Sequence, residues 1–366
     1  AWLVWGIALT ESRTAMLTLA LATAAVTLMR PSCLSQKEVR AVQGVLGVYL
    51  LLLAAKPVLA SALGLHMPLT LLERSAGELR WSLWQMSLEA SLESPWWGYG
   101  VGRSNAGYFE VFEGYQHKLG NTYFEQSHNL ILDLALWAGW PLALLLCVCA
   151  GVWLFRTARG IRSAEALIVL SALLVFLVHA MLEFPLHYGY FLWPFFALAG
   201  ALSGQAQRGG RGLFRVHWAA VLALLISLGS LLVVIAQDYL KIEQAFTELR
   251  FQVARVGTGH DETPPQTLLL TDWPDAIALS RSMPKAGMSA REIAHWEALM
   301  LYNTSPLALR KVIGAHRLNG HEAEAQAWAI RACWLLSEKA CRGLLDEWPR
   351  PSTSAPPSGT PSGQAR

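Results

Sequence analysis

Residues 128–155 read HNLILDLALWAGWPLALLLCVCAGVWLF, a histidine and an asparagine followed by 26 mostly apolar residues. A helix needs about 20 mostly apolar residues to cross a lipid bilayer, so this stretch predicts a transmembrane helix. Titratable side chains are costly to place at a membrane, and those that occur there tend to mark functional sites. His128, at the entrance of the predicted span, is therefore the first candidate for a functional residue.

Four more apolar runs are candidate spans, at residues 15–29, 41–63, 164–182 and 216–236. A shorter sixth run, 187–203, begins with aromatic residues. The chain is 54% hydrophobic and 15% charged, whereas a typical soluble domain is about 25% charged. This composition disfavours the alternative that the runs are buried core helices of a soluble protein.

Basic residues gather in three short connections between these runs. They are Arg30, Lys37 and Arg40, then Arg156, Arg159 and Arg162, and then Arg208, Arg211 and Arg215. If every run crosses, all three connections lie on one side, which the positive-inside rule makes cytoplasmic. The loop 64–127, the turn 183–187 and all residues after 237 then lie on the periplasmic side of a bacterial inner membrane. His128 and His179 are predicted to reach that same side.

The predicted fold class is all-α. It is a polytopic transmembrane bundle with a long periplasmic loop and a C-terminal soluble helical domain that resembles tetratricopeptide repeats. The expected parts are transmembrane helices at 1–63, the loop at 64–127, further transmembrane helices at 128–236, the helical domain at 237–348 and a disordered tail at 349–366. The chain begins in an apolar stretch without an initiator methionine, which we interpret as the end of a helix in a longer protein.

Two segments carry a helical pattern outside the spans. Residues 78–93 place apolar side chains at helical spacing with tryptophans between them, which fits either a helix at the membrane interface or one packed on the spans. Residues 305–338 predict a helix pair broken at 318–320. One such pair cannot bury its own apolar face, so it is expected to stack on neighbouring helices.

The five cysteines form no disulfide framework. Cys333 and Cys341 would lie about 12 Å apart on one straight helix, which is too far for a disulfide. We therefore expect free thiols unless the helix breaks between them. No Cys/His spacing resembles a zinc site, and no nucleotide-binding loop appears. We expect no metal site, no cofactor and no nucleic-acid partner.

His128 is predicted to lie at a helix N-terminus, where anions are favoured. A neutral histidine there can accept a proton from a nucleophile, and a charged one can bind phosphate. The alternative is a packing role beside the helix cap, with Asn129 as the N-cap residue. His179 and Glu183 are spaced i, i+4 and share a helix face if the helix reaches that far. They either act together at a site or form a pair that only fixes the turn.

Arg13 is a cation on the predicted periplasmic side, and so are Arg80 and Arg103. A guanidinium can bind a phosphate with a planar pair of donors. Together the three arginines predict a pyrophosphate-binding patch that faces His128. The alternative for Arg13 is that its side chain extends to the membrane surface without a ligand.

The order of the motifs resembles the O-antigen ligase/polymerase superfamily. The motifs are TESRTA at 10–15, SPWWGYGVG at 94–102 and QSHNLILDLALWAGWP at 126–141. Within it, HAMLEFPLHYGYFL at 179–192 and the helical extension resemble the bacterial protein O-oligosaccharyltransferases of the pilin-glycosylating (PglL) type. The resemblance covers roughly residues 8–345.

The resemblance implies a multi-pass glycosyltransferase of the inner membrane, in contact with membrane lipid. It would take an oligosaccharide from undecaprenyl pyrophosphate on the periplasmic face. The acceptor would be a Ser or Thr of a periplasmic, pilin-like protein. His128 matches the family's essential loop histidine, Arg13 the arginine of its Ser-Arg motif, and the pair at 179 and 183 its His-x-x-x-Glu pattern. The candidate catalytic residues are His128, His179 and Glu183, and the candidate substrate-binding residues are Arg13, Arg80, Arg103, Gln126, Asn129 and Tyr188.

Two positions depart from the family pattern. Phe184 stands where a tyrosine is common, and His187 stands where a tryptophan is common. If that tyrosine's hydroxyl binds substrate, Tyr188 or Tyr190 must replace it here. Other functions stay open: a ligase acting on lipid A-core, a glycan polymerase, a transporter with a proton relay, or a scaffold. The chain shows no inverted repeat, which argues against the transporter, and one repeat-like unit is too little to favour the scaffold.

Overall fold

The computed structural model describes residues 2–10, 12–62, 64, 79–120, 123–206, 217–257, 262–302 and 304–346. Every regular element within these ranges is a helix, so the predicted all-α class is confirmed for the described part. The chain divides into two compact units. Unit 1 comprises Ala1–Gly120 and Phe124–Leu240, and unit 2 comprises Asn121–Tyr123 and Lys241–Arg366.

Three described helices are long and apolar enough to cross a membrane, at Gln36–Lys56, Leu130–Gly160 and Trp218–Ala254. Two shorter apolar segments, Thr14–Leu28 and Ala164–Ala180, correspond to the other two predicted spans. The membrane character predicted for the chain is thus supported by length and composition. Residues 207–216 lie outside the described part, and so does the third basic connection. The predicted orientation of the spans stays a prediction.

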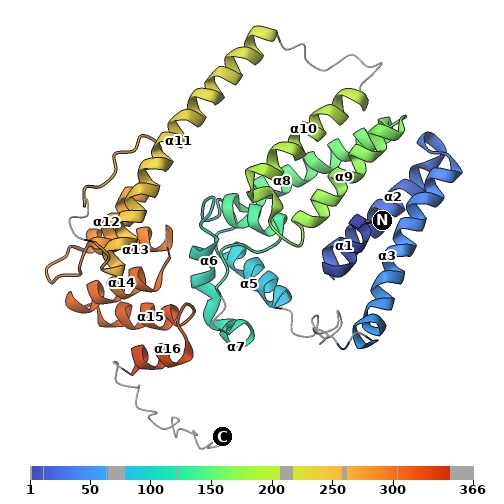
Figure 1. Cartoon of the computed structure of the whole chain (residues 1–366). Helices are drawn as coiled ribbons and strands as arrows, with labels where there is room; N and C mark the ends of the chain where they lie inside the picture. Colours follow the sequence, from blue (N-terminus) through green and yellow to red (C-terminus); the bar gives the residue numbers. More distant parts are fainter. Residues whose placement is uncertain are drawn as a thin grey trace, which may run out of the picture. The chain divides into compact units, whose positions relative to one another are not determined.

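Unit 1 begins with α1 (Trp2–Thr10), α2 (Arg13–Cys33) and α3 (Gln36–Ala62). Helix α2 packs on α3 and on α9 (Ala164–Ala180), as Figure 1 shows. Helix α3 starts with a capping box. The Ser35 N–H donates to Glu38 Oε2 over 2.8 Å, and the Glu38 N–H donates to Ser35 Oγ over 3.4 Å.

Helix α8 (Leu130–Gly160) and helix α9 form a hairpin whose open end carries the candidate site. Ser163 caps α9 by accepting the Ala166 N–H. Helix α9 ends at Ala180, a 3-10 turn η2 (Pro185–His187) follows, and α10 (Gly189–Ala206) leads away. The Asn129 side chain donates to Met181 O over 3.4 Å. The beginning of α8 and the end of α9 therefore meet, as the sequence predicted.

Helix α8 is broken at Gly139, which has a positive φ of 78°. The loop at 94–102 lies against the break and supplies hydrogen bonds to it. The Tyr99 and Gly100 N–H groups donate to Leu136 O and Trp137 O, and the Trp140 N–H donates to Pro95 O. The sequence predicted the span without indicating this break. Non-helical backbone is tolerated at such a point because neighbouring backbone satisfies its polar groups.

The loop between α3 and α8 contains α5 (Arg80–Glu93), α6 (Ser104–Val111), η1 (Phe112–Gly114) and α7 (Gln116–Leu119). Helix α5 buries Leu83, Met86 and Ala90, the apolar positions predicted from helical spacing. It packs on α6 and α8, which favours the packed interpretation of this helix. Glu78 and its predecessors from residue 65 lie outside the described residues.

Unit 2 contains the C-terminal part of α11 (Trp218–Ala254) and five shorter helices. These are α12 (Asp272–Arg281), α13 (Ala290–Tyr302), α14 (Pro306–Leu318), α15 (Glu322–Ala332) and α16 (Glu338–Leu345). The break between α14 and α15 lies at Asn319 and Gly320, where the sequence predicted it. The likeness to a tetratricopeptide repeat stays a prediction.

Cys333 and Cys341 form a disulfide, with their Cα atoms 4.9 Å apart. The expectation of free thiols was wrong because it assumed one straight helix. Helix α15 ends at Ala332 and α16 begins only at Glu338, so the chain turns between the two cysteines. The predicted disordered tail lies outside the described residues.

Candidate functional site

His128 has a left-handed backbone conformation, with φ of 56°. This conformation costs an L-residue roughly 1–2 kcal/mol because its Cβ approaches the following carbonyl oxygen. Residues other than glycine keep it only where the surroundings impose it, and such positions cluster at functional sites. The positive φ of His128 therefore indicates that the surrounding structure imposes this conformation, and it marks His128 as a candidate functional residue.

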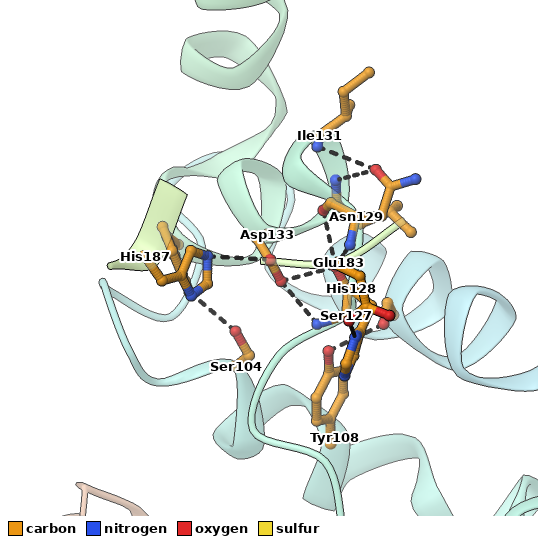
Figure 2. A network of polar contacts seen from close by, with 12 residues as sticks. Ser104, Tyr108, Ser127, His128, Asn129, Ile131, Asp133, Glu183 and His187 are labelled. Carbon is orange, nitrogen blue, oxygen red and sulfur yellow. Dashed lines mark hydrogen bonds and ion pairs between the residues drawn. The ribbon is translucent and has the colours of Figure 1, made fainter. Parts of the chain in front are cut away.

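The neighbours on both sides of His128 are fixed by hydrogen bonds (Figure 2). Asp133, which is 1% exposed, accepts the Ser127 N–H over 2.8 Å and the Ser127 hydroxyl over 2.7 Å, both at Oδ1. The Asn129 side chain accepts the N–H groups of Ile131 and Leu132 over 3.1 and 3.3 Å. Asn129 is thus the N-cap of α8, the structural alternative foreseen for it.

Glu183 joins His128 to Arg80. Its Oε2 lies 2.9 Å from His128 Nδ1, and its Oε1 pairs with the Arg80 guanidinium. The hydrogen bond with His128 is the main cause that lowers the pKa of Glu183. Partial burial opposes this shift, and the charge of Arg80 adds to it. An ionised carboxylate can only accept, so Nδ1 carries the hydrogen and Nε2 of neutral His128 is left as the acceptor.

A pocket of about 310 Å³ opens beside Glu183. Its lining residues are Ser12, Thr14, His179, Glu183, Phe184, Pro185, Tyr188 and Phe191. The segment around Arg13 and the His-x-x-x-Glu segment therefore share one pocket. Arg13 begins α2, but its side chain lies outside the described residues.

Aromatic rings surround the histidine and the pocket. The rings of Phe184 and Phe124 meet the His128 ring edge-on, with centroids 4.8 and 6.4 Å away. Tyr188 stacks on Tyr190 with a centroid distance of 5.2 Å. The aromatic contacts place apolar surfaces beside the polar groups of His128 and Glu183.

Glu183 has partners that its i, i+4 spacing from His179 did not indicate. Its carboxylate contacts His128 and Arg80. Its N–H donates to His179 O over 2.8 Å, and both residues line the pocket. The joint action of His179 and Glu183 and the binding of pyrophosphate by Arg80 stay predictions.

Three other predicted residues have these positions. His179 lies on the pocket wall. Arg103 precedes α6, and its N–H donates to Gly100 O over 3.1 Å. Gln126 is half-buried directly before Ser127. None of these contacts tests the catalytic role of His179 or the substrate-binding roles of Arg103 and Gln126, which stay predictions.

Sequence reasoning missed Asp133 and His187. Asp133 is the one charged residue within the apolar run 130–155, and an ionisable residue in a predicted span is itself a signal of function. His187 Nε2 lies 3.5 Å from Asp133 Oδ2. Its ring packs on Trp137 with centroids 5.0 Å apart. Within the described ranges, no group of three or more His, Cys, Asp or Glu residues could hold a metal ion.

Two protein-family models match consecutive parts of the chain. The O-Antigen ligase family matches residues 1–147, and the family of the virulence factor membrane-bound polymerase, C-terminal, matches residues 167–342. Both parts of the chain are thus similar to families of O-antigen ligases and related membrane-bound polymerases. The superfamily predicted from the motifs is confirmed, and the matches include both the site and the C-terminal helices.

Two curated relatives of the chain come from Acinetobacter baylyi. The chain is 27% identical to a general O-oligosaccharyltransferase over 238 residues, which are 65% of this chain and 40% of the relative. It is 33% identical to a ComP-specific O-oligosaccharyltransferase over 129 residues, which are 35% of this chain and 23% of the relative. The chain thus spans less than half the length of these relatives. No solved structure matches it.

Proposed function

We propose that the full-length protein transfers an oligosaccharide from undecaprenyl pyrophosphate to a Ser or Thr of a periplasmic, pilin-like protein. Support for transfer to protein comes from the two relatives, both named O-oligosaccharyltransferases. The observation that carries the chemistry is the contact of His128 Nδ1 with Glu183, backed by Arg80. This arrangement supplies a base of defined tautomer beside a pocket.

In the proposed reaction His128 Nε2 accepts the proton of the acceptor hydroxyl while the hydroxyl oxygen attacks the anomeric carbon of the glycan. The bond between that carbon and the pyrophosphate oxygen breaks, and the pyrophosphate leaves with its electron pair. Glu183 stabilises the imidazolium that forms. The hydrogen bond with His128, and after it the charge of Arg80, lowers the pKa of Glu183 and so favours its ionised form. The arrangement follows the logic of a base oriented by a carboxylate.

The leaving pyrophosphate needs cations where its charge develops. Arg13 is the first candidate because its neighbours Ser12 and Thr14 line the pocket with Glu183. It also begins α2, and a helix N-terminus favours anions. Arg103 is the second candidate. Because pyrophosphate is already a good leaving group, the step requires no nucleotide.

The site is proposed to face the periplasm from a multi-pass protein of the inner membrane. Helices long enough to span support membrane insertion. The disulfide between Cys333 and Cys341 suits an oxidising compartment, which supports a periplasmic C-terminal domain. The basic connection with Arg156, Arg159 and Arg162 lies at the other end of α8 from His128, as the positive-inside rule requires.

A second candidate function is ligation of a glycan to lipid A-core. The match of residues 1–147 to the O-Antigen ligase family favours it. A polymerase is a third, since residues 167–342 match a family described as a membrane-bound polymerase. All three share donor chemistry and differ in the acceptor, so the acceptor must be measured.

The test expresses the full-length protein with a lipid-linked glycan pathway and a periplasmic pilin-like acceptor, in a host that lacks its own ligase. The acceptor's intact mass should rise by one glycan with the wild type and stay unchanged with His128→Ala. His117→Ala is the matched control, because His117 is exposed on α7. Glycan attached to lipid A-core instead of the acceptor protein would show that the protein is a ligase. Glycan ladders of increasing repeat length would show that it is a polymerase.

A further inference from the structure

Asp133 connects the two segments that supply the His128–Glu183 pair. Its Oδ1 accepts both hydrogen bonds from Ser127, the residue directly before His128. Its Oδ2 lies 3.5 Å from Nε2 of His187, four residues after Glu183. Figure 2 shows this carboxylate between the two segments. One buried group thus contacts the His128 turn and the turn that follows Glu183.

We propose that Asp133 is a positioning residue, which holds His128 in its left-handed conformation and at hydrogen-bonding distance from Glu183. The proposal rests on the function proposed above. Residues with a Cβ leave a positive φ unless their neighbours prevent it. Ser127 is fully buried and also accepts the Asn129 N–H over 3.1 Å, so its position determines the backbone on both sides of residue 128. Without the Asp133 acceptor, residue 128 relaxes and its ring leaves Glu183.

His187 is the second partner of Asp133. Its ring lies 5.0 Å from Trp137 and 5.7 Å from Phe184, measured between centroids. Trp137 is itself held, because its Nε1 donates to the buried Ser104 hydroxyl over 3.0 Å. These contacts fix His187, and through it Asp133, relative to the turn that carries Glu183.

Asp133 acts through other residues rather than on the substrate. It is 1% exposed and is not among the residues that line the described pocket. A group in this place affects the rate through the placement of His128 and leaves substrate affinity largely unaltered. This separates a positioning role from a binding role in kinetic measurements.

The test measures transfer by the purified full-length protein from a lipid-linked glycan to an acceptor peptide. Asp133→Leu removes both acceptor oxygens and leaves a side chain of similar size. We expect kcat to fall about 100-fold, the effect of displacing a catalytic group such as the His128 ring by roughly 1 Å. The acceptor KM should stay within about threefold, because the pocket is intact. Asp133→Asn keeps an oxygen for Ser127, so its kcat should stay within about tenfold of the wild type, the loss from one weakened hydrogen bond.

Ser127→Ala gives a second route if Asp133→Leu does not reach the membrane. It removes one hydrogen bond, and kcat is expected to fall about tenfold with KM unchanged. Wild-type kcat in Ser127→Ala or in Asp133→Leu would overturn the positioning role. An Asp133→Asn variant as slow as Asp133→Leu would do the same.

A readout without turnover separates this inference from the proposed function. Diethyl pyrocarbonate acylates exposed imidazoles, and peptide mass spectrometry gives the rate at His128. The rate should rise in Asp133→Leu and remain at the wild-type value in Asp133→Asn. An unchanged rate in Asp133→Leu contradicts the inference even if the protein transfers no glycan. If the acylation rate of His128 rises in Asp133→Leu but the wild-type protein transfers no glycan, the proposed function is overturned and the positioning role of Asp133 stands.

Discussion

At the scale of single residues, the site is a chain of three side chains joined by an ion pair and a hydrogen bond. Arg80 pairs with Glu183, and Glu183 accepts from His128 Nδ1. The sequence predicted that His128 and Glu183 belong to one site because the ends of two antiparallel helices meet. It could not identify Arg80 as their partner, since Arg80 lies 103 positions before Glu183 on a different helix. Long-range pairs of this kind follow from packing rather than from local spacing.

The pH dependence of the pair follows from the lowered pKa of Glu183. A carboxyl whose pKa falls on folding stabilises the folded state above its unfolded pKa, about 4.3, and loses this effect as the pH falls through the lower folded value. Wild-type protein should therefore melt at a higher temperature than Glu183→Gln at pH 7. The difference should shrink as the pH falls below about 4.3, the unfolded pKa, because the carboxyl then becomes protonated. Thermal melts in detergent across pH 3–8 measure it, with Glu113→Gln, an exposed residue of η1, as control. A difference that does not shrink between pH 6 and pH 3 would contradict this account.

At the scale of elements, helix α8 shows what an apolar run does and does not determine. Its length and composition predict a span, and the helix in the structure is long and apolar enough for one. The break at Gly139 could not be predicted from the run, because it depends on the distant loop at 94–102 that satisfies the freed backbone groups. The disulfide was missed for a related reason, since the turn between α15 and α16 has no strong breaker residue.

Gly139→Ala tests whether the break is required. A Cβ at this position would lie 2.3 Å from Trp96 O, and the φ of 78° is unfavourable for alanine. We expect a loss of about 1–3 kcal/mol of stability, or disruption of the loop contact, from the strained backbone alone. Gly151→Ala in the same helix is the matched control, since a Cβ there meets nothing within 4 Å. It should be neutral or raise the melting temperature, because alanine favours helix over glycine by about 1 kcal/mol.

Equal melting temperatures of the two alanine variants in detergent would contradict this account of the break. Transfer activity gives a second comparison. Gly139→Ala should also slow transfer, because α8 between residues 130 and 139 carries the turn of His128. Gly151→Ala should not.

At the scale of the whole molecule, each unit can be tested for the side of the membrane it occupies. Unit 2 contains the Cys333–Cys341 disulfide, and we propose that this unit lies in the periplasm. The sequence predicted this side from basic connections, one of which lies outside the described residues. The helix pair at 306–332 was predicted because its turn carries a local signal, Asn319 and Gly320. How helices pack around that pair could not be read from one sequence.

Thiol labelling of intact spheroplasts tests the compartment. A membrane-impermeant maleimide should label Cys333 and Cys341 only after an impermeant reductant is added, as read by peptide mass spectrometry. Labelling that requires lysis would place the C-terminal domain in the cytoplasm. The bridge closes a short loop, so Cys341→Ser should destabilise the domain by about 2–3 kcal/mol.

The measurement that tests the central claim most directly is a double-mutant cycle on the transfer rate with His128→Ala, Glu183→Gln and the double variant. If Glu183 acts through His128, its single variant should lose roughly 100-fold in kcat, and His128→Ala should lose more. The double variant should then be no slower than His128→Ala alone, because residues that act as one unit are not additive. Additive losses in the double variant would show that the two residues act independently, and would contradict the account.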